Sequence, residues 1–119
     1  MPNKKEKCSD IIKKIEHRDD GVILRLRGEI DLHCSTHLRG ELLILRERSP
    51  AVTILDMTEV DFMDSSGLAV LVEALQWSRR VGTHLKLFGL HNRVRSIFEI
   101  ARLDTIFDIY ETEQEALAS

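Results

Sequence analysis

The sequence predicts a small α/β protein with a mixed, mostly parallel sheet of about five strands and with about four helices. From residue 22 onward, apolar β-branched runs alternate with segments whose leucines recur at helical spacing. That order is typical of parallel strands joined by crossover helices. Two strand-like runs at the start are separated by a turn signal at residues 19–21 and are close enough to pair as a hairpin. The 119 residues suit one domain with one core.

The first half of the chain is expected to hold three strands and one helix. Residues 11–16 could form an edge strand, and residues 22–27 alternate between apolar and more polar positions as a half-buried strand does. Ser35 or Thr36 can cap the next helix, which Pro50 stops. Residues 51–57 read as a short buried strand, followed by an expected loop over residues 58–63.

The second half repeats this alternation. A helix is expected after Asp64, with Gly82 at its end, then a strand at residues 84–90 and a helix marked by apolar positions 94–101. Residues 106–110 form a last short strand, and residues 112–115, TEQE, have the spacing of a capping box that opens a terminal helix. We expect residues 1–9 to be a flexible tail and residues 10–119 to be a single domain.

Composition argues against several functional classes. The net charge is −3 and the pI about 5.9, so no basic surface for nucleic acid is indicated. Neither a signal peptide nor an apolar run of membrane-spanning length is visible, so we expect a cytoplasmic protein that contacts no membrane. The only cysteines, Cys8 and Cys34, form no CxxC pair and are expected to be free thiols in a reducing compartment.

Motifs for metal, cofactor or catalytic chemistry are missing from the sequence. His33 and His37 are four residues apart, but no third ligand is evident, so no metal site is predicted. There is no phosphate-binding glycine loop, and no cofactor is predicted. The G-x-S-x-G elbow of serine hydrolases is also absent around Ser65.

Residues 60–75, VDFMDSSGLAVLVEAL, place two serines between a strand-like run and a helix-like run. Asp64 is positioned to cap the helix, and Ser65 and Ser66 fall in its first turn. A helix N-terminus has a positive dipole end, so the helix should tolerate a phosphate on Ser65. The added charge would alter the surface shown to a partner more than the fold, and Gly67 would let a partner's backbone approach. Residues 64–67 are also good capping chemistry, and this stretch alone favours that structural role.

Three blocks of sequence carry a resemblance to a known family. They are LRLRGEIDLHCSTHL at residues 24–38, VTILDMTEVDFMDSSGLAVLVEAL at residues 52–75, and LKLFGLHNRVRSIFEIARLDTIFDIYETEQEAL at residues 85–117. In order and spacing they resemble the STAS domain family of anti-sigma factor antagonists, over roughly residues 12–118. One departure is Arg102, which stands where many members have a glycine suited to a left-handed helix end. The end of that helix is therefore open to a different construction.

The resemblance implies a regulatory role without catalysis. In phosphorylatable members the acceptor is the serine directly after the aspartate of the motif, here Ser65. The unmodified protein would capture an anti-sigma factor that is itself a serine kinase with a histidine-kinase-like ATPase fold. Phosphorylation would end the capture, a metal-dependent serine phosphatase would restore it, and sigma-dependent transcription in a bacterium would respond.

The resemblance also places the GEID turn beside the phosphorylation site. The residues expected to face the partner are Gly28, Glu29, Asp31, His33, Asp61, Phe62, Met63, Asp64, Ser66, Gly67 and Leu68. Within the same family, the alternative is an interaction or scaffold subunit of a signalling or transport assembly that is never phosphorylated. A third hypothesis, a small hydrolase, would need a base within hydrogen-bond reach of Ser65 and a concave pocket.

Overall fold

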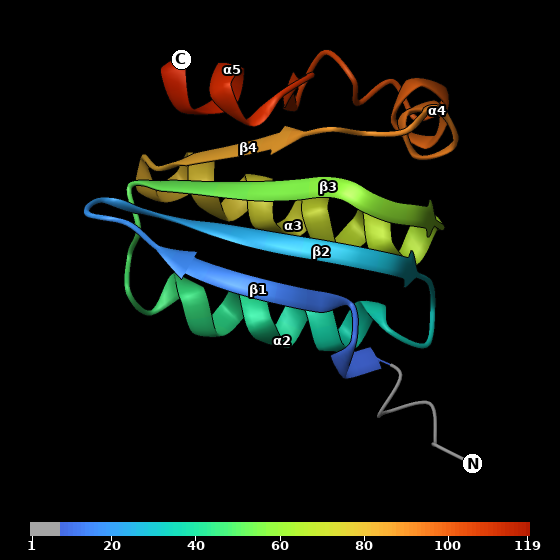
Figure 1. The fold of residues 1–119 in the computed structure, drawn as a ribbon, viewed down its shortest axis with the longest axis horizontal. Coiled ribbons are helices and arrows are strands. Elements are labelled where there is room, and N and C mark those ends of the chain that lie inside the picture. The colour runs from blue at the N-terminus through green and yellow to red at the C-terminus, as the bar shows by residue number, and fades with distance from the viewer. Residues whose placement is uncertain (1–7) are drawn as a thin grey trace.

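One five-stranded sheet organises residues 8–119, which are the residues described by the computed structural model (Figure 1). Figure 1 shows α2 and α3 together behind the sheet and α5 along its far edge. The described elements, in chain order, are β1 (Ile12–His17), β2 (Gly21–Ile30), α2 (Ser35–Arg46), β3 (Val52–Met63), α3 (Ser65–Val81), β4 (His84–Phe88), α4 (Asn92–Ile100), β5 (Asp108–Tyr110) and α5 (Glu113–Ala118).

The sheet is mixed and mostly parallel, with an opening hairpin, as the sequence predicts. The strand order is β1-β2-β3-β4-β5, with β1 antiparallel to β2 and all other pairs parallel. A tight hairpin joins the first two strands, where the Arg18 N–H donates to the Gly21 carbonyl at 2.8 Å. The carboxyl ends of β2 and β3 therefore meet at one edge of the sheet, which is where β2 leads toward α2 and β3 leads into α3 (Figure 1).

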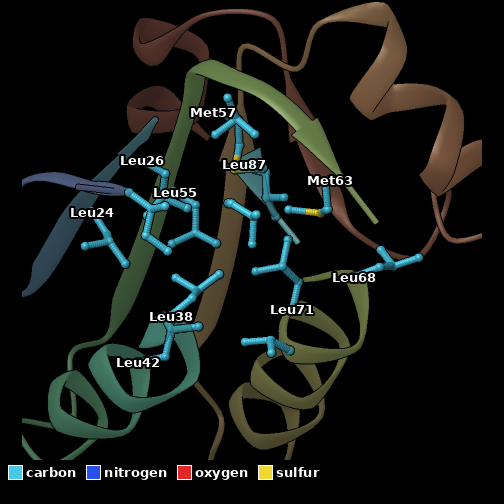
Figure 2. Close-up of a cluster of buried hydrophobic side chains, with 14 of the residues drawn as sticks. Leu24, Leu26, Leu38, Leu42, Leu55, Met57, Met63, Leu68, Leu71 and Leu87 are labelled. Carbon is cyan, nitrogen blue, oxygen red and sulfur yellow. The ribbon is translucent and has the colours of Figure 1, made fainter. Parts of the chain in front are cut away.

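The main core lies between the sheet and helices α2, α3 and α4. Figure 2 shows side chains of the strands pointing toward those of α2 and α3. Burying a leucine of this kind contributes about 1.5–3 kcal/mol, so this layer is the main source of stability. The labelled members of the cluster are Leu24, Leu26, Leu38, Leu42, Leu55, Met57, Met63, Leu68, Leu71 and Leu87.

The opposite face of the sheet holds a smaller apolar cluster and an ionic network. Ile23, Ile54, Phe88 and Ala116 form the buried part of that cluster, so α5 packs on this face. Beside it, the Arg25 guanidinium binds three carboxylates: Asp56 at 2.9 Å, Glu113 at 2.8 Å, and Glu16. This network connects β1, β2, β3 and α5.

Strand β3, with 12 residues, is longer than the run predicted at residues 51–57, and the loop expected over residues 58–63 is wrong. Residues 58–63 continue β3 beside β2, but the register shifts twice, between Arg25 and Arg27 and again between Gly28 and Glu29. Each shift adds one residue to β3 and breaks the two-residue alternation of buried side chains. The buried positions Met57, Val60 and Met63 consequently fall three residues apart, a pattern that hides a strand from sequence analysis.

Helix ends follow their predicted signals except at the start of α2. Thr112 caps α5, its hydroxyl accepting the Glu115 N–H at 3.2 Å, and Gly82 ends α3 with a φ of 81°. Capping of α2 by Ser35 or Thr36 is wrong. The N-cap is Cys34, which makes no side-chain capping bond, and Ser35 is already helical.

Arg102 builds the left-handed helix end that glycine provides in many members of the resembled family. Its φ is 59°, the Leu103 N–H donates to the Phe98 carbonyl at 2.8 Å, and the Arg102 N–H donates to the Glu99 carbonyl at 3.0 Å. These two bonds form a Schellman motif. The left-handed geometry forms in spite of the side chain, so arginine bears a conformational cost that glycine would avoid.

Candidate partner-binding site around Ser65

Asp64 joins the end of β3 to the first turn of α3. Its backbone is extended, with φ −105° and ψ −174°, and its carboxylate Oδ1 accepts the N–H groups of Ser66 at 2.9 Å and Gly67 at 3.3 Å. The other oxygen, Oδ2, accepts the Leu32 N–H at 3.0 Å. The predicted cap is therefore confirmed. The same side chain also fastens the turn after β2 to the start of α3.

The two serines beside Asp64 have different environments. The Ser66 hydroxyl donates to Asp64 Oδ1, and Ser66 is partly buried. Ser65 is exposed, and its side chain makes no hydrogen bond with any residue of the described range 8–119. Of the two hydroxyls, the one on Ser65 is thus free to meet another molecule.

The charge state of Asp64 is set by the same bonds. Partial burial raises the pKa of the Asp64 carboxyl, but hydrogen bonds from Ser66, Gly67 and Leu32 outweigh that effect and hold the pKa below its ordinary value. Asp64 is therefore ionised at neutral pH. A negative charge at a helix N-terminus also suits the helix dipole.

Three of the residues predicted to face a partner are covered by the protein itself. Met63 is 0% exposed, Leu68 is buried in the main core, and Gly67 is buried. A Cβ on Gly67 would lie 2.8 Å from the Ile30 carbonyl oxygen and 2.9 Å from the Met63 Cγ. The expected open approach at Gly67 is wrong, because the glycine lets α3 pack closely on the end of β2.

The remaining predicted residues form an accessible rim. Glu29, His33 and Asp61 are exposed, and Gly28, Asp31, Phe62 and Asp64 are partly buried, as is Ser66. Gly28, with a φ of 78°, lies at the second register shift, and Asp61 is the additional residue of β3 there. The bulge consequently brings Asp61 out of the ladder toward the end of β2.

Several of these residues line a cavity of about 590 Å³ at the carboxyl edge of β2 and β3. Five carboxylates surround it, with one arginine and one histidine, so its surface is strongly acidic. The lining residues are Asp10, Ile11, Arg27, Gly28, Glu29, Asp31, His33, Cys34, Glu59 and Asp61. Ser65 is not among the lining residues, so the cavity borders the serine site rather than contains it.

Comparison with known proteins decides the family. The chain matches the STAS domain over residues 13–116. The chain belongs to the STAS domain family. A relative from Listeria monocytogenes, an anti-sigma-B factor antagonist, is 36% identical over 103 residues that cover 86% of this chain and 90% of the relative.

Solved structures share the STAS fold. A putative anti-sigma factor antagonist from Thermotoga maritima superposes with a TM-score of 0.84 at 24% identity, covering 88% of this chain and 91% of the other. The Bacillus cell fate determinant SpoIIAA in its phosphorylated form gives a TM-score of 0.70 at 23% identity, covering 88% of this chain and 96% of the other. At these identities the likeness establishes the fold alone.

The expectation of two free cysteines in this STAS domain is wrong. Cys8 and Cys34 are joined in a disulfide, and both are buried. Residues 1–7 of the expected tail lie outside the described residues, but Cys8 and Ser9 are helical and Cys8 packs into the core. A separation of 26 residues gives no sequence signal for pairing, because only the fold brings residue 8 back to the turn after β2.

Leu32 is an exposed residue beside the Ser65 turn that sequence analysis did not single out. Its side chain is 71% exposed, although its N–H is bonded to Asp64. Single exposed apolar side chains are normal on protein surfaces, and this one lies next to the Ser65 turn. In the sequence it reads only as one apolar position of the GEIDLH segment, and nothing there indicates that it points outward.

Neither a metal site nor a membrane span emerges from the described part of the STAS domain. No cluster of three or more histidine, cysteine or acidic side chains within residues 8–119 is arranged to hold a metal ion. Cys34 is also committed to its disulfide. Among the helices described, none combines the length and apolarity that crossing a membrane requires.

Proposed function

We propose that this STAS domain is an anti-sigma factor antagonist switched by phosphorylation of Ser65. In the unmodified state it sequesters an anti-sigma factor, and phosphorylation releases that factor, thereby controlling sigma-dependent transcription. One observation carries the choice of residue: within residues 8–119 the Ser65 hydroxyl is exposed and has no hydrogen-bond partner, whereas the Ser66 hydroxyl is bound to Asp64. The 36%-identical relative, itself an anti-sigma-B factor antagonist, supports the class of function.

The electrostatics around Ser65 favour a surface switch over a change of fold. A phosphate adds about −1.5 to −2 charges at pH 7. The Ser66 and Gly67 N–H groups already bond to Asp64, so the start of α3 has little to offer the phosphate, which would project outward. The neighbouring carboxylates of Asp61 and Asp64 strengthen the negative field there. A partner that fits the neutral serine would meet an unpaired charge in its interface, which is costly.

The partners follow from the same proposal. The anti-sigma factor is a serine kinase with a histidine-kinase-like ATPase fold, and a metal-dependent serine phosphatase reverses the modification. Because the kinase needs ATP, we place the cycle in the cytoplasm. The domain acts by binding rather than by catalysis, and the accessible residues of the Ser65 rim, together with Leu32, supply the contact surface.

Capture from source-cell lysate tests the proposal and identifies the kinase. Immobilised wild-type protein is compared with Ser65→Asp, and bound proteins are identified by mass spectrometry. We expect a kinase-like ATPase to bind the wild type and to be lost from Ser65→Asp. Equal retention of the same proteins by both forms would favour a constitutive scaffold subunit, the alternative within this family.

Phosphate mapping with the purified kinase and ATP then tests the residue. Ser65→Ala is expected to abolish incorporation, whereas the matched variant Ser66→Ala is expected to retain it. Phosphate that persists on Ser66 in the Ser65→Ala protein would contradict the assignment. Thermal melting of Ser65→Asp should match that of the wild type, because the side chain is exposed.

A further inference from the structure

We propose that a cavity at the end of the domain remote from Ser65 binds a small aromatic carboxylate. The cavity lies between the carboxyl-terminal halves of α2 and α3 and the amino ends of β3 and β4. Figure 1 shows the arrows of β3 and β4 pointing away from this end, whereas the Ser65 turn follows the carboxyl end of β3. None of the residues of the Ser65 rim lines the cavity, so binding there does not depend on the proposed function.

The size of the cavity suits one aromatic ring. Its volume is about 170 Å³, and a cavity of about 150 Å³ lined by apolar side chains is large enough to bind benzene. Val81, one of the lining residues, is 48% exposed, so the cavity opens to solvent beside it. A ring that enters would leave water for a largely apolar wall, which is favourable. The apolar lining residues include Leu42, Leu45, Ala74, Trp77, Val81 and Leu85.

Arg46 gives this apolar cavity a positive charge. Its guanidinium lies over the Trp77 ring, 4.2 Å from the ring centre, and both residues line the cavity. The contact leaves the N–H donors of the guanidinium available, because within residues 8–119 they make no hydrogen bond and no ion pair. An arginine is charged at any physiological pH, and its planar set of donors matches the two oxygens of a carboxylate.

The described residues offer no anion that competes for this charge. Among residues 8–119, the ionisable side chains that line the cavity are those of Arg46 and His84, and no carboxylate is included. Glu73, one turn before Trp77 on α3, is bound by Arg39 Nε at 3.0 and 3.1 Å. Hydrogen bonds from Arg39 are also the main cause of the lowered pKa of Glu73, to which Arg46 adds a weaker attraction. The charge at the cavity therefore favours an anionic ligand over a cationic one.

Hydroxyl groups in the wall can complete the binding of a carboxylate. The Ser78 and Thr83 hydroxyls bond to each other at 3.1 Å. The hydroxyls of Ser49 and Thr53, which also line the cavity, make no hydrogen bond with any other residue of the part of the chain that the structure describes. A carboxylate only accepts hydrogen bonds, so each of these hydroxyls can donate to it. An apolar wall with a few polar donors is the usual composition of a small-molecule site.

NMR chemical-shift titration of the full chain with benzoate tests the site. Trp77 is the only tryptophan, so its indole N–H gives one unambiguous signal from the cavity wall. We expect saturable shifts at Trp77, Val81 and His84, with a Kd of about 1 mM or lower, while the signals of the Ser65 turn do not move. No saturation at tens of millimolar benzoate, or saturable shifts confined to other parts of the domain, would overturn the proposal.

Two further probes test the chemical class of the ligand. Benzyl alcohol and benzylammonium carry the same ring as benzoate, but the first is neutral and the second is a cation. Each should bind at least about tenfold more weakly than benzoate, because neither can form the charge-assisted hydrogen bonds with Arg46. Binding of either probe as tight as that of benzoate would overturn the assignment of a carboxylate.

Substitutions in the wall locate the site. Arg46→Met should weaken benzoate about tenfold and leave benzyl alcohol unchanged, whereas Arg48→Met, at an exposed arginine outside the cavity, should alter neither. Ala74→Leu should abolish binding of both probes by filling the cavity, and its melting temperature shows whether the domain stays folded. Unchanged benzoate affinity in Arg46→Met, or in a folded Ala74→Leu protein, would overturn the proposal. If Ala74→Leu does not fold, the Arg46→Met comparison decides.

Discussion

Replacing Asp64 by alanine removes the connection between β2, β3 and α3. The side chain accepts the N–H groups of Ser66 and Gly67, the Ser66 hydroxyl and the Leu32 N–H. Loss of an aspartate N-cap costs about 1–2 kcal/mol. The bond from Leu32 lies at an exposed turn where water can replace it, so it adds about 0.5 kcal/mol. We expect the free energy of unfolding to fall by about 2 kcal/mol.

Urea denaturation at neutral pH, followed by circular dichroism, measures this change. Asp61→Ala is the matched control, since Asp61 is an exposed carboxylate three residues earlier on the same strand end. Its removal should alter the free energy of unfolding by less than about 0.5 kcal/mol. If Asp64→Ala were no more damaging than Asp61→Ala, the role assigned to the Asp64 bonds would be refuted.

The difference in stability between the wild type and Asp64→Ala should also depend on pH. The pKa of Asp64 is lowered in the folded state, so its stabilisation is fully present above the unfolded pKa of about 4 and is lost as pH falls through the folded pKa. The difference between wild type and Asp64→Ala should therefore be constant from pH 5 to 7, on the order of 2 kcal/mol, and shrink toward pH 3. A difference that grows on acidification would contradict the sign of the shift.

Three other substitutions test separate features of the fold. Arg102→Gly should raise the free energy of unfolding by about 1 kcal/mol, because glycine adopts the φ of 59° without the cost that arginine bears, and a higher melting temperature would show it. Gly67→Ala should lower the free energy of unfolding by about 1–2 kcal/mol, since overpacking against the Ile30 carbonyl outweighs the gain in helix propensity. Arg25→Met should lower the free energy of unfolding by about 3 kcal/mol, because the buried Asp56 would lose its cation. In the wild type the pKa of Asp56 lies below its ordinary value, and an NMR titration of the variant should find that pKa raised.

Each of these three substitutions is paired with a control variant whose expected effect on stability is smaller or opposite in sign. Arg102→Ala keeps the side-chain Cβ and should not be stabilised as the glycine variant is. Gly40→Ala, within α2 and with open space around its Cβ, should be stabilising by about 0.5–1 kcal/mol, and a Gly67→Ala protein that behaved the same way would contradict the close packing. Arg39→Met breaks only an exposed ion pair with Glu73 and should cost less than about 1 kcal/mol.

The order of elements was predictable because local signals agree with the fold. Leucines at helical spacing, the cap at Asp64, Gly82 and the Thr112 capping box each fall where the structure uses them. The end of β3 was not predictable, since two register shifts remove the alternation on which strand recognition depends. Bulges of this kind are set by pairing with β2, which no local window contains.

The candidate site was predictable in location but only partly in its surface. The family resemblance, and not the local residues, indicates Ser65, and neither reveals that the neighbouring Ser66 hydroxyl is occupied. Met63 and Gly67 were expected to face a partner, although the first fills the core and the second allows close packing with Ile30. The Cys8–Cys34 bond depends on tertiary placement alone, so composition and spacing pointed to the wrong chemical state.

The affinity of the purified anti-sigma kinase for Ser65-phosphorylated protein, relative to unmodified protein, tests the central claim most directly. Calorimetry with non-hydrolysable ATP analogue prevents turnover during the titration. The phosphorylated protein should bind on the order of 100-fold more weakly, because an unpaired charge would be placed within the interface at a cost of a few kcal/mol. Equal affinity of the two forms would contradict the switch and leave the serines as capping residues of a constitutive binding domain.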